Sequence, residues 1–291
     1  MHLLITTLVY DSYVSLFDLI CLRSLMQKGN IPLLLERGYK ITYLVYTKPE
    51  DEVSVREIVG RYGMDGVSYT VVPSSDCRRR YLVDITNYSV VNGLPLFIAN
   101  PDIFIGDGSL SNLMVYNTKR SNICLAALHV RVDMKTFMEW LDKVEGDISN
   151  PVLVTHSMTM LSQSWRDAYV DKGRNCSWSA GAAMQKIGDK LWIVNFRIPN
   201  VFLARMSRAD YNYFSVNYDL GCYDHSWPEH LVRDKRFKYI GSSDVFYAVE
   251  MTSPQNNTSP LRDNDLWNDE ASNNMLHSET NRNFLSVVRG E

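Results

Sequence analysis

The feature that most constrains this chain is the alternation of short apolar segments with longer amphipathic segments in its N-terminal part. Each apolar segment is short and rich in β-branched and aromatic residues, which is typical of a strand buried on both faces of a sheet. Alternating strands and helices predict a parallel sheet, because each helix returns the chain to the edge at which the next strand starts. The sequence therefore predicts the α/β class, with a mainly parallel sheet and helices on both faces. The expected strands cover residues 3–10, 40–47, 67–73 and 102–105, and the expected helices cover 15–28, 50–62 and 81–99, the last interrupted by Gly93 and Pro95.

The length and composition of the chain are those of a globular protein. Its 291 residues are 45% hydrophobic and 22% charged, enough for one large domain with its own core. A net charge of −3 gives no bulk attraction to nucleic acid, so we expect no nucleic-acid partner. The five cysteines are scattered and form no Cys-x-x-Cys pair, which argues against a disulfide framework and a structural zinc site.

The first apolar segment, residues 3–10, is the part of the sequence that most needs to be distinguished from a targeting signal. Threonines interrupt it, Asp11 ends it, and it lacks both a basic region and a small-residue cleavage site. We interpret it as a buried strand, and we expect a cytoplasmic protein with no integral membrane segment.

The second half of the sequence has a different pattern. A strand over 123–132 and helices over 134–144 and 159–170 are followed by strand patterns with no long helix between them, which indicates a mixed or antiparallel subdomain. We therefore predict a single domain over residues 1–252, with halves at 1–118 and 119–252, followed by an irregular tail over 253–291. The later strands are expected at 191–197, 201–205 and 238–252.

Residues just after the predicted strands are the first candidates for ligand binding. In parallel α/β sheets, ligands bind outside the carboxyl ends of the strands. Tyr10 follows the first strand, and Tyr46 and Thr47 end the second. The basic run 78–80 follows the third strand, and its arginines, Arg80 among them, are either part of a solvated loop or contacts for a diphosphate.

A second candidate lies where the fourth strand runs into Gly106-Asp107-Gly108-Ser109. Glycines allow a backbone to approach a ligand closely, and a carboxylate at a strand end can bind a hard divalent cation. A helix starting near Ser109 would present its N-terminus to an anion. Together these features suit a metal-bound diphosphate, with Asp107, Gly108 and Ser109 in contact with it. The alternative is an ordinary turn at Asp107-Gly108 with Ser109 as a helix cap.

A third candidate is a loop at 217–230 that combines ionisable residues with glycine and proline. Carboxylates beside imidazoles can supply a general base or metal ligands. The alternative is a polar loop anchored in the core by Trp227. The ionisable residues are Asp219, Asp224, His225, Glu229 and His230.

A fourth candidate is the segment 241–250, in which Asp244 precedes a strand and Glu250 lies six residues further on. Both side chains could face the same side of that strand. The alternative is an ordinary edge strand with no catalytic role.

Several of these stretches resemble GT-A glycosyltransferases of the nucleotide-diphospho-sugar transferase type. The likeness spans about residues 3–252 and is similar to a branch found in bacterial and viral sugar-coat gene sets, which implies a role in polysaccharide biosynthesis. The stretches that carry it are 24–32, 43–47, 101–110, Tyr223-Asp224-His225 and Ser243-Asp244.

The resemblance implies a GT-A-like, Rossmann-type sheet whose first half binds a nucleoside-diphosphate sugar and whose second half binds a glycan or other hydroxyl acceptor. It implies that Asp107 binds Mn²⁺ or Mg²⁺, which would neutralise the leaving diphosphate. Asp224 or Asp244 would deprotonate the acceptor hydroxyl, and His225 would be a metal ligand or an orienting group. The sequence departs from the family pattern because it has no strict Asp-x-Asp.

Two other functions remain as alternatives. A nucleotidyltransferase has the same kind of sheet, but it usually carries a glycine-rich loop with basic residues after the first strand, and residues 6–12 contain neither. A non-catalytic carbohydrate-binding or scaffold protein would also fit the 17 tyrosines and 6 tryptophans, since aromatic rings stack on sugars. Binding of a nucleoside diphosphate separates a transferase from a scaffold.

Overall fold

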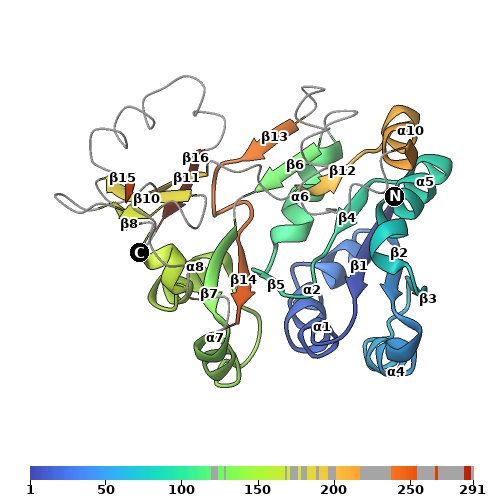
Figure 1. The fold of residues 1–291 in the computed structure, drawn as a ribbon, viewed down its shortest axis with the longest axis horizontal. Coiled ribbons are helices and arrows are strands. Elements are labelled where there is room, and N and C mark those ends of the chain that lie inside the picture. The colour runs from blue at the N-terminus through green and yellow to red at the C-terminus, as the bar shows by residue number, and fades with distance from the viewer. Residues whose placement is uncertain are drawn as a thin grey trace. The chain divides into compact units, whose positions relative to one another are not determined.

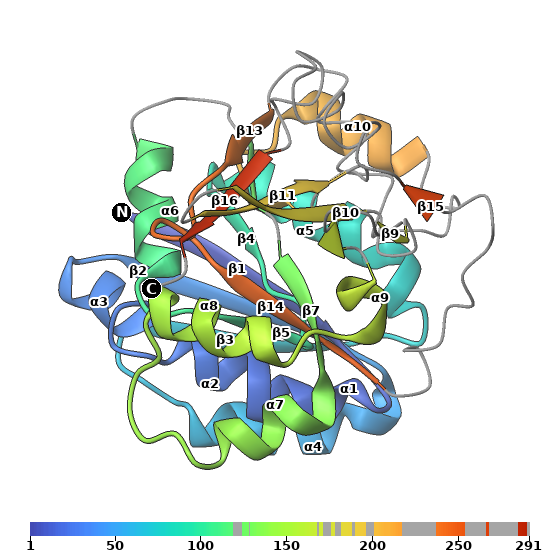
Figure 2. The same cartoon turned by 90° about the vertical axis from the view of Figure 1, so that its left-hand side faces the viewer.

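Figures 1 and 2 show the fold of the chain in a computed structural model. The structure describes residues 1–118, 124–127, 129–167, 169–170, 176–177, 182–187, 190–195, 201–216, 237–253, 266–267 and 285–289.

The chain divides into two compact units, and each unit is assembled from several separate segments. The predicted halves, 1–118 and 119–252, differ from these units because the chain returns to the first unit at Asn200. Unit 1 comprises Met1–Phe104, Leu110–Ala126 and Asn200–Lys238, and unit 2 comprises Ile105–Ser109, Ala127–Pro199 and Tyr239–Glu291.

Unit 1 is built on a seven-stranded sheet with the strand order β13-β6-β12-β4-β1-β2-β3. The four strands β3, β2, β1 and β4 run parallel, and β12 joins β4 and β6 in the antiparallel sense. This arrangement confirms the predicted α/β class with a mainly parallel sheet. The strands are β1 (His2–Val9), β2 (Lys40–Thr47), β3 (Val67–Pro73), β4 (Leu96–Ile98), β6 (Cys124–Ala127), β12 (Val201–Ala204) and β13 (Phe237–Ile240).

Helices cover both faces of this sheet. Neighbouring residues of a strand point to opposite faces of a sheet, so Tyr43 and Tyr46 of β2 lie on different faces. The ring of Tyr43 packs edge-on against Phe17 of η1, and the ring of Tyr46 packs edge-on against Tyr81 of α5. Figure 2 shows the same division, with α1, α2 and α4 on one side of β1 and β2, and α5 on the other. The helical elements are α1 (Tyr13–Leu16), the π-helix η1 (Phe17–Leu22), α2 (Arg23–Leu25), α3 (Ile31–Glu36), the 3₁₀-helix η2 (Pro49–Asp51), α4 (Glu52–Arg61), α5 (Cys77–Asn92), α6 (Ser109–Thr118) and α10 (Arg208–Val216).

The predicted helix at 81–99 is wrong over its second part. Helix α5 ends at Asn92, Gly93 takes a left-handed conformation with φ of 63°, and the chain then enters strand β4. A left-handed glycine followed closely by proline is a common end of a helix. β4 is therefore the fourth parallel strand, and the predicted strand at 102–105, observed as β5 (Ile103–Ile105), belongs to a different sheet.

Unit 2 contains β7 and β14, which run parallel and belong to a three-stranded sheet in the order β5-β14-β7. It also contains a four-stranded sheet, β16-β11-β10-β8, in which β10 and β11 form an antiparallel pair. The strands are β7 (His129–Asp133), β8 (Tyr169–Val170), β9 (Cys176–Ser177), β10 (Ala182–Ile187), β11 (Lys190–Asn195), β14 (Ala248–Thr252), β15 (Leu266–Trp267) and β16 (Leu285–Arg289).

Several elements of this part differ from the sequence-based expectation. The expected strand at 123–132 is two strands, β6 and β7, which belong to different sheets. The expected strand at 238–252 is likewise split into β13 and β14 by a turn. Of the helix expected at 159–170, only the short α9 (Gln163–Arg166) is observed, and the longer α8 (Asn150–Thr159) ends where the expected helix was to begin. Helix α7 (Met134–Leu141) lies where a helix was expected. Within the predicted tail at 253–291, β16 pairs with β11. No helix among the described residues is long and apolar enough to cross a membrane.

Candidate functional site

The carboxyl ends of β1, β2 and β3 bring a group of charged and aromatic side chains together in unit 1. Tyr10 and Asp11 follow β1, Lys48 follows β2, and Arg78 lies in the first turn of α5, shortly after β3. These positions meet because parallel strands end at the same edge of the sheet. We call Tyr10, Asp11, Lys48 and Arg78 the strand-end cluster.

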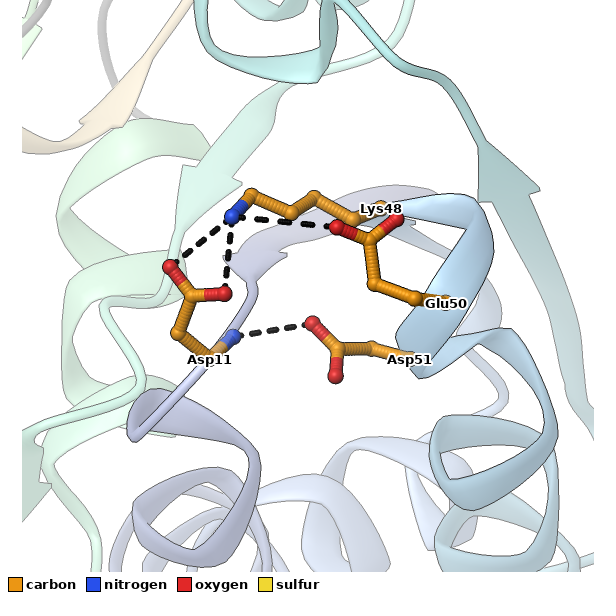
Figure 3. Close-up of polar contacts among 4 residues, drawn as sticks. All are labelled: Asp11, Lys48, Glu50 and Asp51. Atoms are coloured by element: carbon orange, nitrogen blue, oxygen red, sulfur yellow. Dashed lines mark hydrogen bonds and ion pairs between the residues drawn. The ribbon is translucent and has the colours of Figure 1, made fainter.

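Lys48 is held mainly by Asp11 (Figure 3). Its Nζ lies 2.7 Å from Asp11 Oδ1 and 2.9 Å from Oδ2, and 3.9 Å from Glu50 Oε1. The hydrogen bond to Asp11 raises the pKa of Lys48 above its usual value, so the lysine keeps its positive charge. Asp11 itself has a left-handed backbone, with φ of 52°, and its N–H donates to Asp51 Oδ2 at 2.8 Å. The carboxylate of Asp51 therefore helps to hold the turn that presents Asp11.

The ring of Tyr10 lies beside two cations that come from two other strand ends. Lys48 Nζ is 5.5 Å and Arg78 Cζ is 5.4 Å from the ring centroid, both within the range of a cation–π contact. The ring also packs edge-on against Tyr13, with 5.6 Å between centroids. The cluster thus places two positive groups and an aromatic surface at one edge of the sheet.

Arg78 lies in the first turn of α5, at the end of the helix whose dipole favours anions. The N-terminal end of α5 carries a partial positive charge, and Asp76 at the N-cap makes no side-chain cap hydrogen bond. Arg78 is exposed and forms no ion pair with a carboxylate in the part of the chain that the structure describes. Arg80 is also exposed on this turn. The basic run 78–80, for which the sequence allowed either a solvated loop or a diphosphate contact, therefore lies in the first turn of a helix.

Tyr46 and Thr47 lie behind this edge rather than on its surface. Tyr46 is buried and packs edge-on against Tyr81 at 5.2 Å, and burial raises its pKa. Thr47 is fully buried, and its Oγ1 has no hydrogen-bond partner. Their predicted contact with a base or ribose stays a prediction.

The Gly106–Ser109 motif is tied into unit 2 by hydrogen bonds and close packing. Ser109 is fully buried, and its Oγ donates to Asn150 Oδ1 at 2.9 Å and accepts from the N–H of Tyr247 at 3.3 Å. A Cβ on Gly106 would lie 2.0 Å from Asn150 Oδ1. The glycine is therefore needed for the approach of Asn150.

Asp107 and Gly108 occupy the turn between Gly106 and Ser109. The N–H of Asp107 donates to Ile148 O at 2.7 Å, and its side chain is half-buried. Gly108 has φ of 84°, a left-handed conformation that favours glycine. The turn thus fixes the backbone of Asp107 and leaves its carboxylate partly accessible to solvent.

The two carboxylates of the segment 241–250 lie in different settings within unit 2. Asp244 is exposed in a turn, where its N–H donates to Ser242 Oγ at 3.3 Å. Glu250 is mostly buried and pairs with His129 and with Arg131, whose Nη2 is 3.0 Å from Glu250 Oε1. Burial acts to raise the pKa of Glu250, but the two basic neighbours outweigh it and lower the pKa to about 2.

Sequence reasoning missed three of the residues that the structure brings together. It did not single out Lys48, although this residue directly follows the second predicted strand, and that position is the signal that could have found it. His129 and Arg131 had no such signal, because their contact with Glu250 depends on the pairing of β7 with β14.

The predicted metal-binding and catalytic residues are only partly covered by the structure. Asp224 and His225, with the rest of the loop at 217–230, lie outside the described residues. Among the residues that are described, no group of three His, Cys, Asp or Glu side chains could hold a metal ion. Asp107 alone fits a Mg²⁺ or Mn²⁺ ion only if phosphate oxygens or water complete the coordination, as is usual for Mg²⁺ in phosphate-binding enzymes.

Comparisons with known proteins give no family assignment. No model of a known protein family matches the chain, and no curated protein matches it. Among solved structures, the chain is similar to a Bacillus anthracis protein named as a candidate glucose-1-phosphate thymidylyltransferase and solved in complex with sucrose. The TM-score is 0.41 at 11% identity, over 82% of this chain and 86% of the other. Because so low a score does not establish a common fold, the function has to be inferred from this chain's own residues.

Proposed function

We propose that the protein is a glycosyltransferase that moves a sugar from a nucleoside-diphosphate sugar to a hydroxyl group of a glycan or a similar acceptor. The observation that carries this proposal is the strand-end cluster, in which Lys48 and Arg78 flank the ring of Tyr10 at the ligand-binding edge of a parallel sheet. Cationic side chains bind phosphate oxygens by charge-assisted hydrogen bonds, and an aromatic ring offers a surface for a base or a sugar.

The charges of the cluster suit an anionic ligand that competes with the protein's own carboxylates. In the free protein, Lys48 is paired with Asp11, whereas Arg78 has no carboxylate partner among the described residues. A diphosphate would bind first to Arg78 and the N-terminal turn of α5, and would then share Lys48 with Asp11. The two cations would offset part of the charge of the diphosphate.

In the proposed reaction, the bond from the anomeric carbon to the diphosphate oxygen breaks and a bond to the acceptor oxygen forms. The bonding electrons leave with the diphosphate, and the acceptor proton passes to a protein base, for which Asp224 and Asp244 are the candidates. A Mn²⁺ or Mg²⁺ ion, when bound, would supply Lewis-acid stabilisation of the leaving diphosphate. Asp107, with His225 as a second candidate ligand, would hold that ion.

The alternative function is nucleotidyl transfer, which makes a nucleoside-diphosphate sugar instead of using one. The connection after β1 argues against it, because only Tyr10, Asp11 and Ser12 separate β1 from α1 and none of them is glycine or basic. A non-catalytic carbohydrate-binding protein is the other alternative, and it would not need the cations of the strand-end cluster.

The test begins with thermal unfolding of the protein in the presence of UDP, GDP, CMP and dTDP compounds, with and without Mn²⁺. A ligand that binds only the folded state raises the melting temperature, so one nucleotide class should stand out. The sugar nucleotide of that class is then incubated with the protein, and free nucleoside diphosphate is measured. In parallel, the nucleoside triphosphate and sugar 1-phosphate are supplied, and pyrophosphate is measured. Release of diphosphate supports the proposal, release of pyrophosphate supports nucleotidyl transfer, and no shift with any nucleotide contradicts both.

A further inference from the structure

Strand β3 ends the seven-stranded sheet, and no other strand in the part of the chain that the structure describes pairs with its outer side (Figure 1). Natural edge strands are usually protected against pairing by lysines, bulges or internal prolines. β3 runs in continuous register with β2 from Val67 to Pro73, carries no charged residue, and has proline only at its last position. The residues of β3 themselves therefore provide none of these protective features before Pro73.

The hydrogen bonds with β2 determine which backbone groups of β3 point outward. Ile41 N–H donates to Gly66 O, and Ser74 N–H donates to Thr47 O. The backbone N–H and C=O groups of the even-numbered residues of β3 therefore point toward β2. The N–H and C=O groups of Val67, Tyr69 and Val71 consequently face the free edge.

Two of these outward groups already have partners within the chain. Val67 N–H donates to Met64 O at 3.1 Å, and Val71 O accepts from Arg56 Nη2 at 3.5 Å. The other four outward groups of these three residues have no partner among the described residues: Val67 O, Tyr69 N–H, Tyr69 O and Val71 N–H.

The four remaining groups are complementary to a second copy of themselves. In an antiparallel pair centred on Tyr69, each Tyr69 N–H meets the Tyr69 O of the other copy, and each Val71 N–H meets the other copy's Val67 O. Of the outward groups of Val67, Tyr69 and Val71, this pairing leaves out Val67 N–H and Val71 O, which would have bonded to each other and are the two already satisfied within the chain. The pattern has the self-complementarity that a two-fold symmetric interface requires.

From this match we propose that the protein forms a symmetric dimer in which two β3 strands pair antiparallel about Tyr69, joining the two sheets into one. The side chains next to the edge suit such a contact. Ser68 and Thr70 are exposed and would lie opposite each other across the interface, a favourable pairing of short polar side chains. Val53, one turn before Arg56 on α4, is 68% exposed and adds apolar surface beside the edge. The proposal is independent of the proposed catalytic function.

The first test measures self-association by sedimentation velocity over a wide concentration series. The double variant Ser68→Lys/Thr70→Lys places lysines opposite lysines in the proposed dimer, at positions that are exposed in the single chain. Its dimer dissociation constant should rise at least about tenfold, because like charges directly opposite each other destabilise a strand pair. The matched control, Val91→Lys/Val216→Lys, adds the same charge at two exposed valines of α5 and α10 and should leave the constant unchanged. A wild-type chain that stays monomeric throughout, or a lysine variant that dimerises as the wild type does, overturns the proposal.

The second test reports the strand register and does not depend on the lysine variant. Residues 68 and 70 of the two copies form a non-hydrogen-bonded pair, whose Cα separation is compatible with a disulfide. Single variants Ser68→Cys and Thr70→Cys, mixed and mildly oxidised, should give a disulfide-linked mixed dimer in much higher yield than either variant alone. The oxidised wild type controls for the native cysteines. Equal crosslinking of each variant with itself, or no mixed product beyond the wild-type level, would exclude this register.

Discussion

Arg78 carries a positive charge at the positive end of its own helix. Arginine in the first turn of a helix is unfavourable by the helix dipole, typically by ~0.3–1 kcal/mol at an exposed position. In this chain the arginine follows β3 at the edge where the parallel strands end, beside Tyr10, and an anion bound there would turn this unfavourable interaction into a favourable one. The local unfavourable charge is thus a physical argument for an anionic ligand at this position.

The first prediction concerns Arg78→Gln, which removes the charge but keeps much of the side chain. We expect the affinity for the nucleoside diphosphate to fall by about 10- to 100-fold, since a hydrogen bond to a charged group is worth roughly 1.5–3 kcal/mol. Isothermal titration calorimetry measures the change directly. Arg37→Gln, at an exposed position just after α3, is the matched control and should bind as the wild type does. Equal affinity of both variants would remove Arg78 from the site.

The second prediction concerns Asp107→Ala. Because the turn at Asp107 is held by its backbone N–H and by Gly108, the variant should keep the fold, which circular dichroism checks. Turnover stimulated by Mn²⁺ should be abolished if Asp107 is a metal ligand. Asp65→Ala, at an exposed position before β3, should retain full stimulation. If Asp107→Ala is stimulated by Mn²⁺ as strongly as the wild type, Asp107 is only a turn residue.

The third prediction concerns the pH dependence of stability that Glu250 confers. Its pKa falls from 4.5 to about 2 on folding, so the paired carboxylate stabilises the folded state fully above about pH 4.5 and loses this contribution as the pH drops toward 2. Glu250→Gln should lower the free energy of unfolding at neutral pH by roughly 3 kcal/mol, because it leaves Arg131 and His129 without their anion.

The measurement is urea unfolding of wild type and variant at neutral pH and at pH 3. The difference between the two proteins should shrink at the lower pH. Glu145→Gln, an exposed change in the same unit, should show little difference at either pH. A Glu250→Gln difference that does not depend on pH would contradict the assigned cause.

At the scale of single elements, the sequence predicted those strands whose pattern lies in their own and adjacent residues. Strands β1, β2 and β3 lie within a residue of their predicted positions, because apolar runs between turn residues are local signals. The predicted helix at 81–99 failed at β4, whose three residues are buried between β1 and β12. So short a strand has too little pattern of its own, and its strand state depends on partners that lie far away in the sequence.

The same distinction applies to the candidate site. Tyr10 could be predicted because it directly follows a strand with a strong pattern. The packing of Gly106 against Asn150 could not be predicted, because it joins residues more than forty positions apart in the sequence. Glycine there was interpreted as space for a ligand, whereas the structure gives it a packing role.

The fourth prediction tests that role with Gly106→Ala. The new Cβ would lie 2.0 Å from Asn150 Oδ1 and 3.2 Å from Asn150 Cα, so Asn150 would have to move and its hydrogen bond with Ser109 would be lost. We expect a loss of at least about 2 kcal/mol in the free energy of unfolding, combining steric strain with an unsatisfied buried hydroxyl. Gly60→Ala, where a Cβ in α4 meets nothing within 4 Å, should instead be neutral or stabilising by up to ~1 kcal/mol. Similar effects of the two changes in chemical denaturation would show that the Asn150 contact is not restrictive.

At the scale of the whole molecule, the sequence predicted the α/β class but not the path of the chain between the units. The predicted boundary at residue 118 follows the change in pattern along the sequence. Unit 1, however, also includes β12 and α10, which come from residues after 200. Nothing local in residues 201–204 indicates that they pair with β4. This pairing depends on the backbone N–H and C=O groups at the edge of β4, which are brought into place only by the assembled sheet.

The fifth prediction follows from that pairing: a fragment ending at residue 118 should not fold stably on its own. In the whole chain, Leu203 and Ala204 pair with β4, Phe202 stacks on Phe97 with 6.3 Å between ring centroids, and α10 packs against α5. The fragment would expose the edge of β4 and the ring of Phe97, and exposure of each large apolar side chain costs about 1.5–3 kcal/mol. Against a typical domain stability of ~5–15 kcal/mol, the loss of several such contacts is enough to unfold the fragment.

The comparison is between residues 1–118 alone and the same fragment co-expressed with residues 119–291, which restore β12 and α10. Alone, the fragment should be insoluble or should lack a cooperative thermal transition in circular dichroism. With its complement, it should be recovered in a soluble complex, because the partner supplies the strand that covers β4. A soluble fragment 1–118 that melts cooperatively without its complement would show that the four parallel strands and their helices form an independent domain, and that β12 adds to a sheet already stable without it.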